Sequence, residues 1–169
     1  MDYFVLWFKL DYRHQYAIWC GNDRELPDQL YNKDGLIPIF QTLNELRKYA
    51  AIYSIELVNE EPILHNLDTA KRWLTIKGKK KYNSELLPAW NLFGDIAAID
   101  SDVSSKFETL TQRYLTPYNK LFLAENLLRP NAIHPKYKPK WNTDDIEGIS
   151  KVLNFGFKLL RKSFRYKTT

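Results

Sequence analysis

Residues 142–166, NTDDIEGISKVLNFGFKLLRKSFRY, have the pattern of one long amphipathic helix. Apolar residues recur at three- and four-residue steps, while charged and amide residues fall on the opposite arc. The apolar members are Ile146, Ile149, Val152, Leu153, Gly156, Phe157, Leu160 and Phe164. Asn142 is a natural N-cap, and the acidic start and basic end of the segment match the helix dipole. A helix of this length must bury its stripe against most of a small domain, so we expect the fold to be organised around it.

The length and composition of the chain predict a single domain covering residues 1–169. Aromatic residues make up 15% of the sequence, which excludes a disordered chain and favours a core of large rings. The sequence contains no long apolar run and no signal-peptide pattern, and its single cysteine, Cys20, cannot form an internal disulfide. We therefore expect a cytoplasmic protein without a membrane partner.

Strand patterns come first along the chain and helical patterns dominate after them, which predicts an α+β fold. Residues 3–10 are apolar on both alternating faces, as in a covered central strand, and residues 16–20 form a hairpin with them. Residues 36–40 and 55–58 are predicted as additional strands, and residues 26–33 as a loop. The prediction is a small antiparallel N-terminal sheet of three or four strands, packed against several helices and the long C-terminal helix.

Five shorter helices are predicted between the hairpin and the C-terminal helix. They are residues 43–53, a short helix opening at Asn66, a helix from Asn83 or Ser84 to about Asp100, residues 101–115 and residues 118–128. Thr42 and Glu45 have the spacing of a capping box at the start of the first helix. Thr116 and Pro117 predict the break between the last two helices.

No motif for catalysis or metal binding is present in the sequence. The three histidines are His14, His65 and His134, and none has a second His or Cys at metal-ligand spacing. Cys20 and His14 could form a nucleophile and base, but a free cysteine in an apolar strand is more often a core residue. His65 beside Glu60 and Glu61 could form an acid–base set, although acidic residues at a turn are more often solvated. We expect no enzyme activity, no cofactor, no metal and no small-molecule substrate.

The charge pattern leaves a nucleic-acid partner as an alternative. The net charge is +5, and basic residues gather in segments 77–81 and 136–140. Trp73 and Tyr82 lie near the first segment, an arrangement that could combine phosphate contacts with base stacking. Such a run of lysines is more often part of a solvated loop. An RNA- or DNA-associated protein that uses the two basic segments is therefore the second functional hypothesis.

A family resemblance supplies the first functional hypothesis. The segments that carry it are Trp19-Cys20-Gly21, residues 35–40 before a helix with residues 46–50, residues 67–74, residues 90–95, residues 118–122 and Trp141. In this order they resemble the immunity proteins of bacterial contact-dependent growth inhibition and related polymorphic toxin systems, over most of the chain. The resemblance implies a cytoplasmic, non-catalytic protein that neutralises one cognate toxin C-terminal domain, often a nuclease, by covering its active site. The basic pI of about 9.1 departs from the acidic character usual among inhibitors of basic nucleases.

The surface that binds such a toxin is expected to be acidic, because a nuclease active site must be cationic enough to hold phosphate. The first-choice residues are Asp95, Asp100, Asp102 and Glu108, at the end of one predicted helix and in the next. The second choice is Glu60 and Glu61, which border a turn at Pro62. A protein partner is accordingly expected in preference to nucleic acid.

Overall fold

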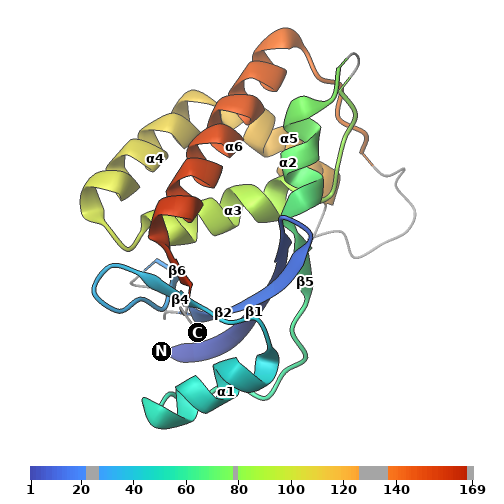
Figure 1. The fold of residues 1–169 in the computed structure, drawn as a ribbon. Helices are drawn as coiled ribbons and strands as arrows, with labels where there is room; N and C mark the ends of the chain where they lie inside the picture. Colours follow the sequence, from blue (N-terminus) through green and yellow to red (C-terminus); the bar gives the residue numbers. More distant parts are fainter. Residues whose placement is uncertain (22–26, 78–79, 126–136, 167–169) are drawn as a thin grey trace.

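Two long antiparallel strands, β1 (Asp2–Leu10) and β2 (Arg13–Gly21), form the centre of the fold (Figure 1). The computed structural model describes residues 1–21, 27–77, 80–125 and 137–166. Asp11 and Tyr12 join the strands, and both have positive φ angles, 51° and 62°. A two-residue turn of this kind matches the twist of the strands it connects. The hairpin is therefore confirmed, with a tighter turn and a longer second strand than predicted.

Two short strands extend the hairpin into a four-stranded sheet of order β3-β2-β1-β5. β3 (Gln29–Leu30) lies in the segment predicted as a loop, because two residues are too few to leave a strand pattern. β5 (Leu64–Asn66) pairs with β1 in parallel, so the sheet is mixed rather than purely antiparallel. Residues 55–58, predicted as a strand, make one isolated bridge to β1 instead. The α+β class is confirmed, while β3 and β5 were not predicted and the strand predicted at residues 55–58 is wrong.

A separate two-stranded sheet joins the two predicted elements 36–40 and 142–166. β4 (Ile37–Ile39) pairs in parallel with β6 (Phe164–Tyr166) and does not belong to the four-stranded sheet. The predicted C-terminal helix therefore ends at Ser163, and Phe164 has an extended backbone. Pairing with a strand far away in the sequence stops the helix, although the apolar period continues through Phe164.

Helix α1 (Leu43–Ile52) covers one face of the central strands, and the other helices cover the opposite face (Figure 1). Its predicted N-cap is confirmed, since the backbone N–H of Glu45 donates to the Thr42 hydroxyl at 3.2 Å. The Glu45 carboxylate accepts from the N–H of Gln41 instead of Thr42, so the reciprocal half of the predicted capping box does not form. Leu46 is fully buried against Ile18 and its neighbours on the sheet. Strand β1 is thus covered on both faces, as its alternating apolar residues predict.

In the described part of the chain, five helices lie on the other face of the sheet. They are α2 (Leu67–Thr75), α3 (Leu86–Ala97), α4 (Ser101–Arg113), α5 (Leu115–Glu125) and α6 (Thr143–Ser163). The N-cap of α3 is Glu85, so the predicted caps Asn83 and Ser84 lie before it. Pro117 belongs to the first turn of α5, where its missing N–H removes no helical hydrogen bond. Residues 126–128 of the predicted helix lie outside the described residues.

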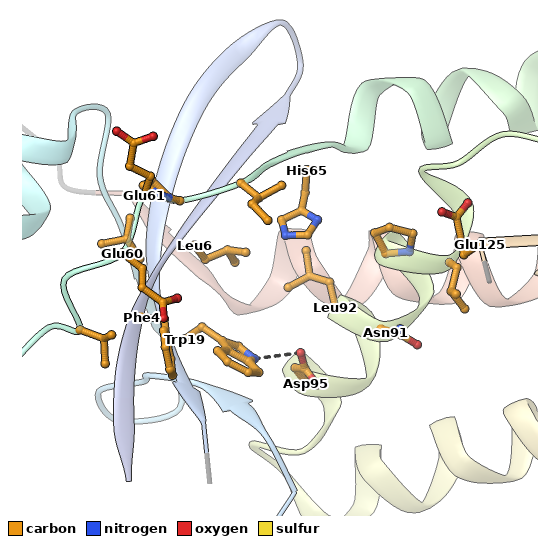
Figure 2. A pocket seen from close by; sticks show the side chains of 16 residues that line it. Phe4, Leu6, Trp19, Glu60, Glu61, His65, Asn91, Leu92, Asp95 and Glu125 are labelled. Carbon is orange, nitrogen blue, oxygen red and sulfur yellow. Dashed lines mark hydrogen bonds between the residues drawn. The ribbon is translucent and has the colours of Figure 1, made fainter. Parts of the chain in front are cut away.

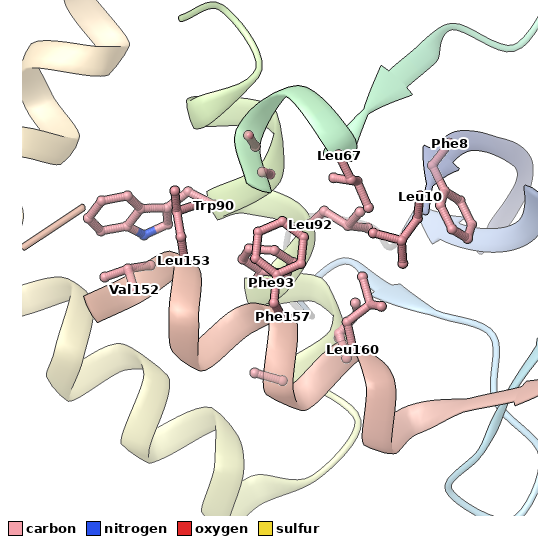
Figure 3. Close-up of a cluster of buried hydrophobic side chains, with 14 of the residues drawn as sticks. Phe8, Leu10, Leu67, Trp90, Leu92, Phe93, Val152, Leu153, Phe157 and Leu160 are labelled. Carbon is pink, nitrogen blue, oxygen red and sulfur yellow. The ribbon is translucent and has the colours of Figure 1, made fainter. Parts of the chain in front are cut away.

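Helix α6 buries its apolar stripe chiefly against α3 (Figure 3). A Cβ added to Gly156 would overlap the Phe93 ring, so the missing side chain lets the two helices approach closely. The rings of Phe93 and Phe157 then pack edge to face, with their centres 5.0 Å apart. The sheet meets the end of the helix, where Phe164 packs against Phe8. The main partner of the long helix is therefore another helix rather than the hairpin.

The predicted N-cap of α6 is confirmed and is also a link to α5. The Asn142 side chain accepts from the N–H of Asp145 at 2.8 Å, and the Asp145 carboxylate accepts from the N–H of Asn142 at 3.0 Å. Asp145 is 1% exposed and forms an ion pair with Lys120 of α5. The reciprocal cap and the buried ion pair fix the start of α6 against its neighbour.

Candidate functional site

A cavity of about 470 Å³ lies between the sheet and helix α3 (Figure 2). We call it the Asp95 cavity. Its lining comes from β1, from Trp19 of β2, from residues 58–65 around the start of β5, from α3 and from Glu125 at the end of α5. Its volume falls within the range of about 300 to 1,000 Å³ that is typical of small-ligand pockets. The cavity is thus large enough to hold a ligand or a side chain of a partner.

The walls of the Asp95 cavity are mainly apolar. Phe4 and Leu6 line it from β1, because these alternate residues point to the face of the sheet that α3 covers. Trp19 lies beside them, with its ring centre 5.3 Å from that of Phe4. Leu87 and Leu92 of α3 form the opposite wall. An occupant would therefore meet aromatic and aliphatic surface over most of its area.

Among the described residues, four carboxylates line the Asp95 cavity, and no lysine or arginine does. Glu60 and Glu61 are exposed on the segment before β5, while Asp95 is partly buried on α3 (Figure 2). The Oε1 atom of Glu125 is shielded from solvent and has no hydrogen-bond partner among the described residues. The ionisable groups in the described lining are therefore mainly acidic, although the whole chain carries a net charge of +5.

Asp95 connects the helices to the sheet at this site. The indole Nε1 of Trp19 donates a 3.0 Å hydrogen bond to Oδ2 of Asp95 (Figure 2). Burial raises the pKa of Asp95 to about 7, the hydrogen bond from Trp19 lowers it, and the charge of Asp28 raises it further. The carboxyl group consequently changes its charge close to neutral pH, and a bound cation would favour the ionised form.

His65 lines the same cavity as Glu60 and Glu61, so the structure brings the three together. Burial lowers the pKa of His65, and the nearby charge of Glu85 opposes this shift. The imidazole is therefore neutral at pH 7. No hydrogen bond among the described residues joins His65 to either glutamate.

The first-choice acidic residues are divided between two places in the fold. Asp95 lines the cavity together with the second-choice residues Glu60 and Glu61. Asp100 is instead the N-cap of α4, where its carboxylate accepts from the N–H groups of Asp102 and Val103. Asp102 and Glu108 are exposed on α4 and do not line the cavity.

Sequence reasoning missed the contribution of α3 beyond Asp95. Leu87, Asn91, Leu92 and Asp95 recur at helical steps along α3 and all line the cavity. This face of the helix was recognisable from its spacing, as an apolar stripe that ends in an amide and a carboxylate. Glu125 carried no comparable signal, because only the tertiary fold brings the end of α5 to the cavity.

The hypothetical pair of Cys20 and His14 does not form. The two residues stand near opposite ends of β2, about 20 Å apart at the rise of a β-strand, and pair with Tyr3 and Lys9 respectively. Cys20 is buried, and burial raises the pKa of its thiol to about 11, so the core interpretation is confirmed. Within the described ranges, no group of three His, Cys, Asp or Glu residues is placed to hold a metal ion.

Among the described lysines of the two basic segments, Lys80 makes contacts within the fold and the others are exposed. The Lys80 ammonium group donates to the carbonyl groups of Trp73 and Leu74 and lies 4.8 Å from the Trp73 ring centre. It therefore satisfies carbonyl groups at the end of α2. Lys77, Lys81, Lys138 and Lys140 are exposed. Lys79, Lys136 and the third histidine, His134, lie outside the described residues.

Comparison with known proteins identifies a similar fold but no family. No protein-family model and no curated protein matches the chain. Among solved structures, the crystal structure of the SatS C-terminal domain in complex with bromine is similar over 98% of this chain and 94% of that chain. The TM-score is 0.55 and the sequence identity is 14%, so the likeness concerns the fold alone. Among the helices in the described part of the chain, none has the length and apolar character needed to cross a membrane.

Proposed function

We propose that this protein is a non-catalytic immunity protein, which neutralises one cognate toxin domain by binding it at the Asp95 cavity. The charge of the cavity carries the proposal, because four carboxylates line it and no lysine or arginine among the described residues does. Such a surface is complementary to a nuclease active site, which must attract phosphate. The resemblance of the sequence segments to immunity proteins supports the same class. Inhibition of this kind would take place in the cytoplasm, by stoichiometric occlusion of the toxin.

The residues around the opening suit a protein partner. Ile63 lines the cavity and is 78% exposed, so it offers apolar surface beside the charged Glu60 and Glu61. A stable interface buries about 800 Å² on each partner, and its strongest contacts gather around a well-packed centre. The cavity would be that centre, and the two glutamates and Ile63 would form part of its border.

The alternative, an RNA- or DNA-associated protein, draws less support from the basic segments. Lys80 donates to backbone carbonyl groups at the end of α2 and stacks on Trp73, so its charge is partly used within the fold. A salt titration separates the two functions. Affinity for phosphate backbones falls steeply as salt rises, whereas a toxin-specific inhibitor is expected to ignore generic nucleic acid.

A growth assay tests the proposal with the product of the reading frame adjacent to the gene that encodes this chain. The C-terminal domain of this product is expressed in a bacterial host, and growth is measured with and without this chain. We expect the domain to arrest growth and the wild-type chain to restore it. An adjacent frame whose product is harmless, or a toxin that this chain does not neutralise, would contradict the proposal.

Two charge-reversal variants assign the neutralisation to a surface. Glu60→Lys with Glu61→Lys reverses exposed charges at the Asp95 cavity, and Asp102→Lys with Glu108→Lys reverses exposed charges on α4. All four side chains are exposed, so both variants are expected to fold, which circular dichroism checks. Protection should be lost in the first variant and kept in the second.

A further inference from the structure

Between Tyr3 and Trp7, no described segment pairs with the edge of strand β1 at the Asp95 cavity, and we call this stretch the open edge. The N–H of Val58 donates to the carbonyl oxygen of Tyr3 at 2.8 Å, and regular pairing with β5 begins at Trp7. Between these two points, residues 59–63 outnumber the residues of β1 opposite them. This segment therefore turns away from β1. The acidic segment with Glu60 and Glu61 belongs to this excursion.

Val5 lies at the centre of the open edge. Alternate residues of a strand direct their backbone groups to the same neighbour, so Val5 faces the same side as Tyr3 and Trp7. Its side chain belongs to the core cluster on the α1 side of the sheet, while Phe4 and Leu6 point to the opposite face. Val5 therefore lines the cavity through its backbone. At this edge its backbone N–H and carbonyl groups make no hydrogen bond to another described segment.

We infer that the Asp95 cavity recognises one arginine or lysine residue in an extended segment of the partner protein. This inference rests on the proposed function and names the chemistry of the partner at the same site. The cationic group would bind between Asp95 on α3 and the glutamates before β5. The peptide backbone beside it would pair with the open edge at Val5, as partner strands do when they add to a sheet.

Each part of an arginine or lysine residue has a complementary part of the cavity. The long aliphatic stem matches the apolar wall of Phe4, Trp19 and Leu92, since such side chains bury their stems and keep the charge in polar surroundings. The Trp19 ring also offers a face for a cation. Phosphate or carboxylate ligands are disfavoured, because the charged groups that the described residues place in the lining are carboxylates and burial favours the neutral form of His65.

A free small amine shares the cationic chemistry but has no peptide backbone, so the test includes both sources. The probes are acetyl-Gly-Arg-Gly-amide, its lysine and glutamine counterparts, and agmatine. The readout is the NMR signal of the Trp19 indole N–H, which donates to Asp95 and is assigned by its loss in Trp19→Phe. We expect the arginine and lysine peptides to shift this signal in a saturable manner, and the glutamine peptide to leave it unchanged.

Agmatine should bind at least tenfold more weakly than the arginine peptide, because it cannot pair with the edge at Val5. Methylation of the arginine backbone nitrogen should weaken the peptide in the same direction. Agmatine binding as tightly as the peptide would make the occupant a free amine and overturn the inference. A glutamine peptide that binds like the arginine peptide would overturn it as well.

Matched variants locate the binding. Asp95→Asn keeps an acceptor for the Trp19 N–H but removes the charge, and it should weaken the arginine peptide at least tenfold. Asp100→Asn alters a carboxylate of α4 outside the cavity and should leave the affinity unchanged. If Asp95→Asn does not fold, the exposed pair Glu60→Gln with Glu61→Gln decides, with an expected loss of severalfold. Equal affinity in the wild type and the folded cavity variants would overturn the inference.

The experiments distinguish a failure of the immunity function from a failure of the cationic recognition site. Neutralisation of the toxin by the wild-type chain, without any peptide-induced shift of the Trp19 signal, would reject the cationic residue and leave the immunity function standing. Saturable binding of the arginine peptide, without neutralisation of the adjacent gene product, would reject the immunity function and leave the recognition site standing.

Discussion

The indole N–H of Trp19 donates a 3.0 Å hydrogen bond to the carboxylate of Asp95, which lies 76 residues further along the chain. This bond joins β2 to α3 across one side of the cavity (Figure 2). Burial raises the pKa of Asp95 to about 7, and the charge of Asp28 adds to this rise. A group that titrates near neutral pH thus links the sheet to the helices.

The contribution of Asp95 to stability is expected to depend on pH. Its pKa is about 7 in the folded protein and near the ordinary 3.8 in the unfolded chain, so the folded state holds the proton more tightly. The stabilisation is fully present below about pH 4 and is lost as the pH rises through about 7. Relative to Asp95→Asn, the free energy of unfolding of the wild type should fall by about 1 to 4 kcal/mol over this interval.

Urea denaturation of both proteins at several pH values between about 4 and 8 measures this difference. The other titratable groups of the cavity, Glu60, Glu61, His65 and Glu125, are present in both proteins, so the comparison isolates Asp95. Stability curves that run parallel across the whole pH range would show that Asp95 has an ordinary pKa.

Gly156→Ala is expected to destabilise the protein, because the added methyl group would overlap the Phe93 ring. Overpacking of this kind costs about 1 to 3 kcal/mol, despite a gain of about 1 kcal/mol in helix propensity. Asn154→Ala is the control on an exposed position of the same helix, and it should be neutral or slightly stabilising. Thermal melting of the two variants makes the comparison, and equal midpoints would mean that α3 and α6 are not in close contact at Gly156.

Asp145→Asn should lower the free energy of unfolding by about 1.5 to 3 kcal/mol, because Asp145 holds Lys120 and the first turn of α6 through charged hydrogen bonds. The neighbouring Asp144 is exposed in the same turn. Asp144→Asn removes only its favourable interaction with the helix dipole, about 0.3 to 1 kcal/mol. Chemical denaturation of both variants checks the order, and a larger loss in Asp144→Asn would argue against the buried ion pair.

Leu153→Ala and Leu160→Ala should each cost about 2 to 5 kcal/mol, since both side chains are fully buried in the core around α6. Lys158→Ala, on the exposed side of the helix, serves as the control. Melting curves of all three variants test whether α6 organises the core. Leucine variants that melt like the parent would show that it does not.

The sequence predicted the elements whose signals are local. The cap at Asn142 and the buried stripe of α6 follow from residues that are neighbours in the helix. The end of α6 was missed, because Phe164 continues the apolar period and its partner Ile37 lies near the other end of the chain. β3 was missed for a similar reason, since its two residues are strand only through their pairing with β2.

The candidate site was predicted in parts rather than as a whole. The clusters of acidic residues in the sequence predicted Asp95 on α3 as one candidate and Glu60 and Glu61 before β5 as a separate alternative. The fold unites these three carboxylates in one cavity and leaves Asp102 on α4 apart from them. No sequence pattern could show this, because the meeting of the sheet and α3 depends on tertiary contacts such as the bond between Trp19 and Asp95.

Calorimetric titration of the proposed toxin domain into two folded variants tests whether the partner binds at the Asp95 cavity. We expect Glu60→Lys with Glu61→Lys to weaken binding at least tenfold, because both reversals would place positive charge beside the cationic partner that we propose. We expect wild-type affinity for Asp102→Lys with Glu108→Lys, whose side chains lie outside the cavity. Unchanged affinity in the first variant, together with a tenfold loss in the second, would exclude binding at the cavity and assign the partner to α4.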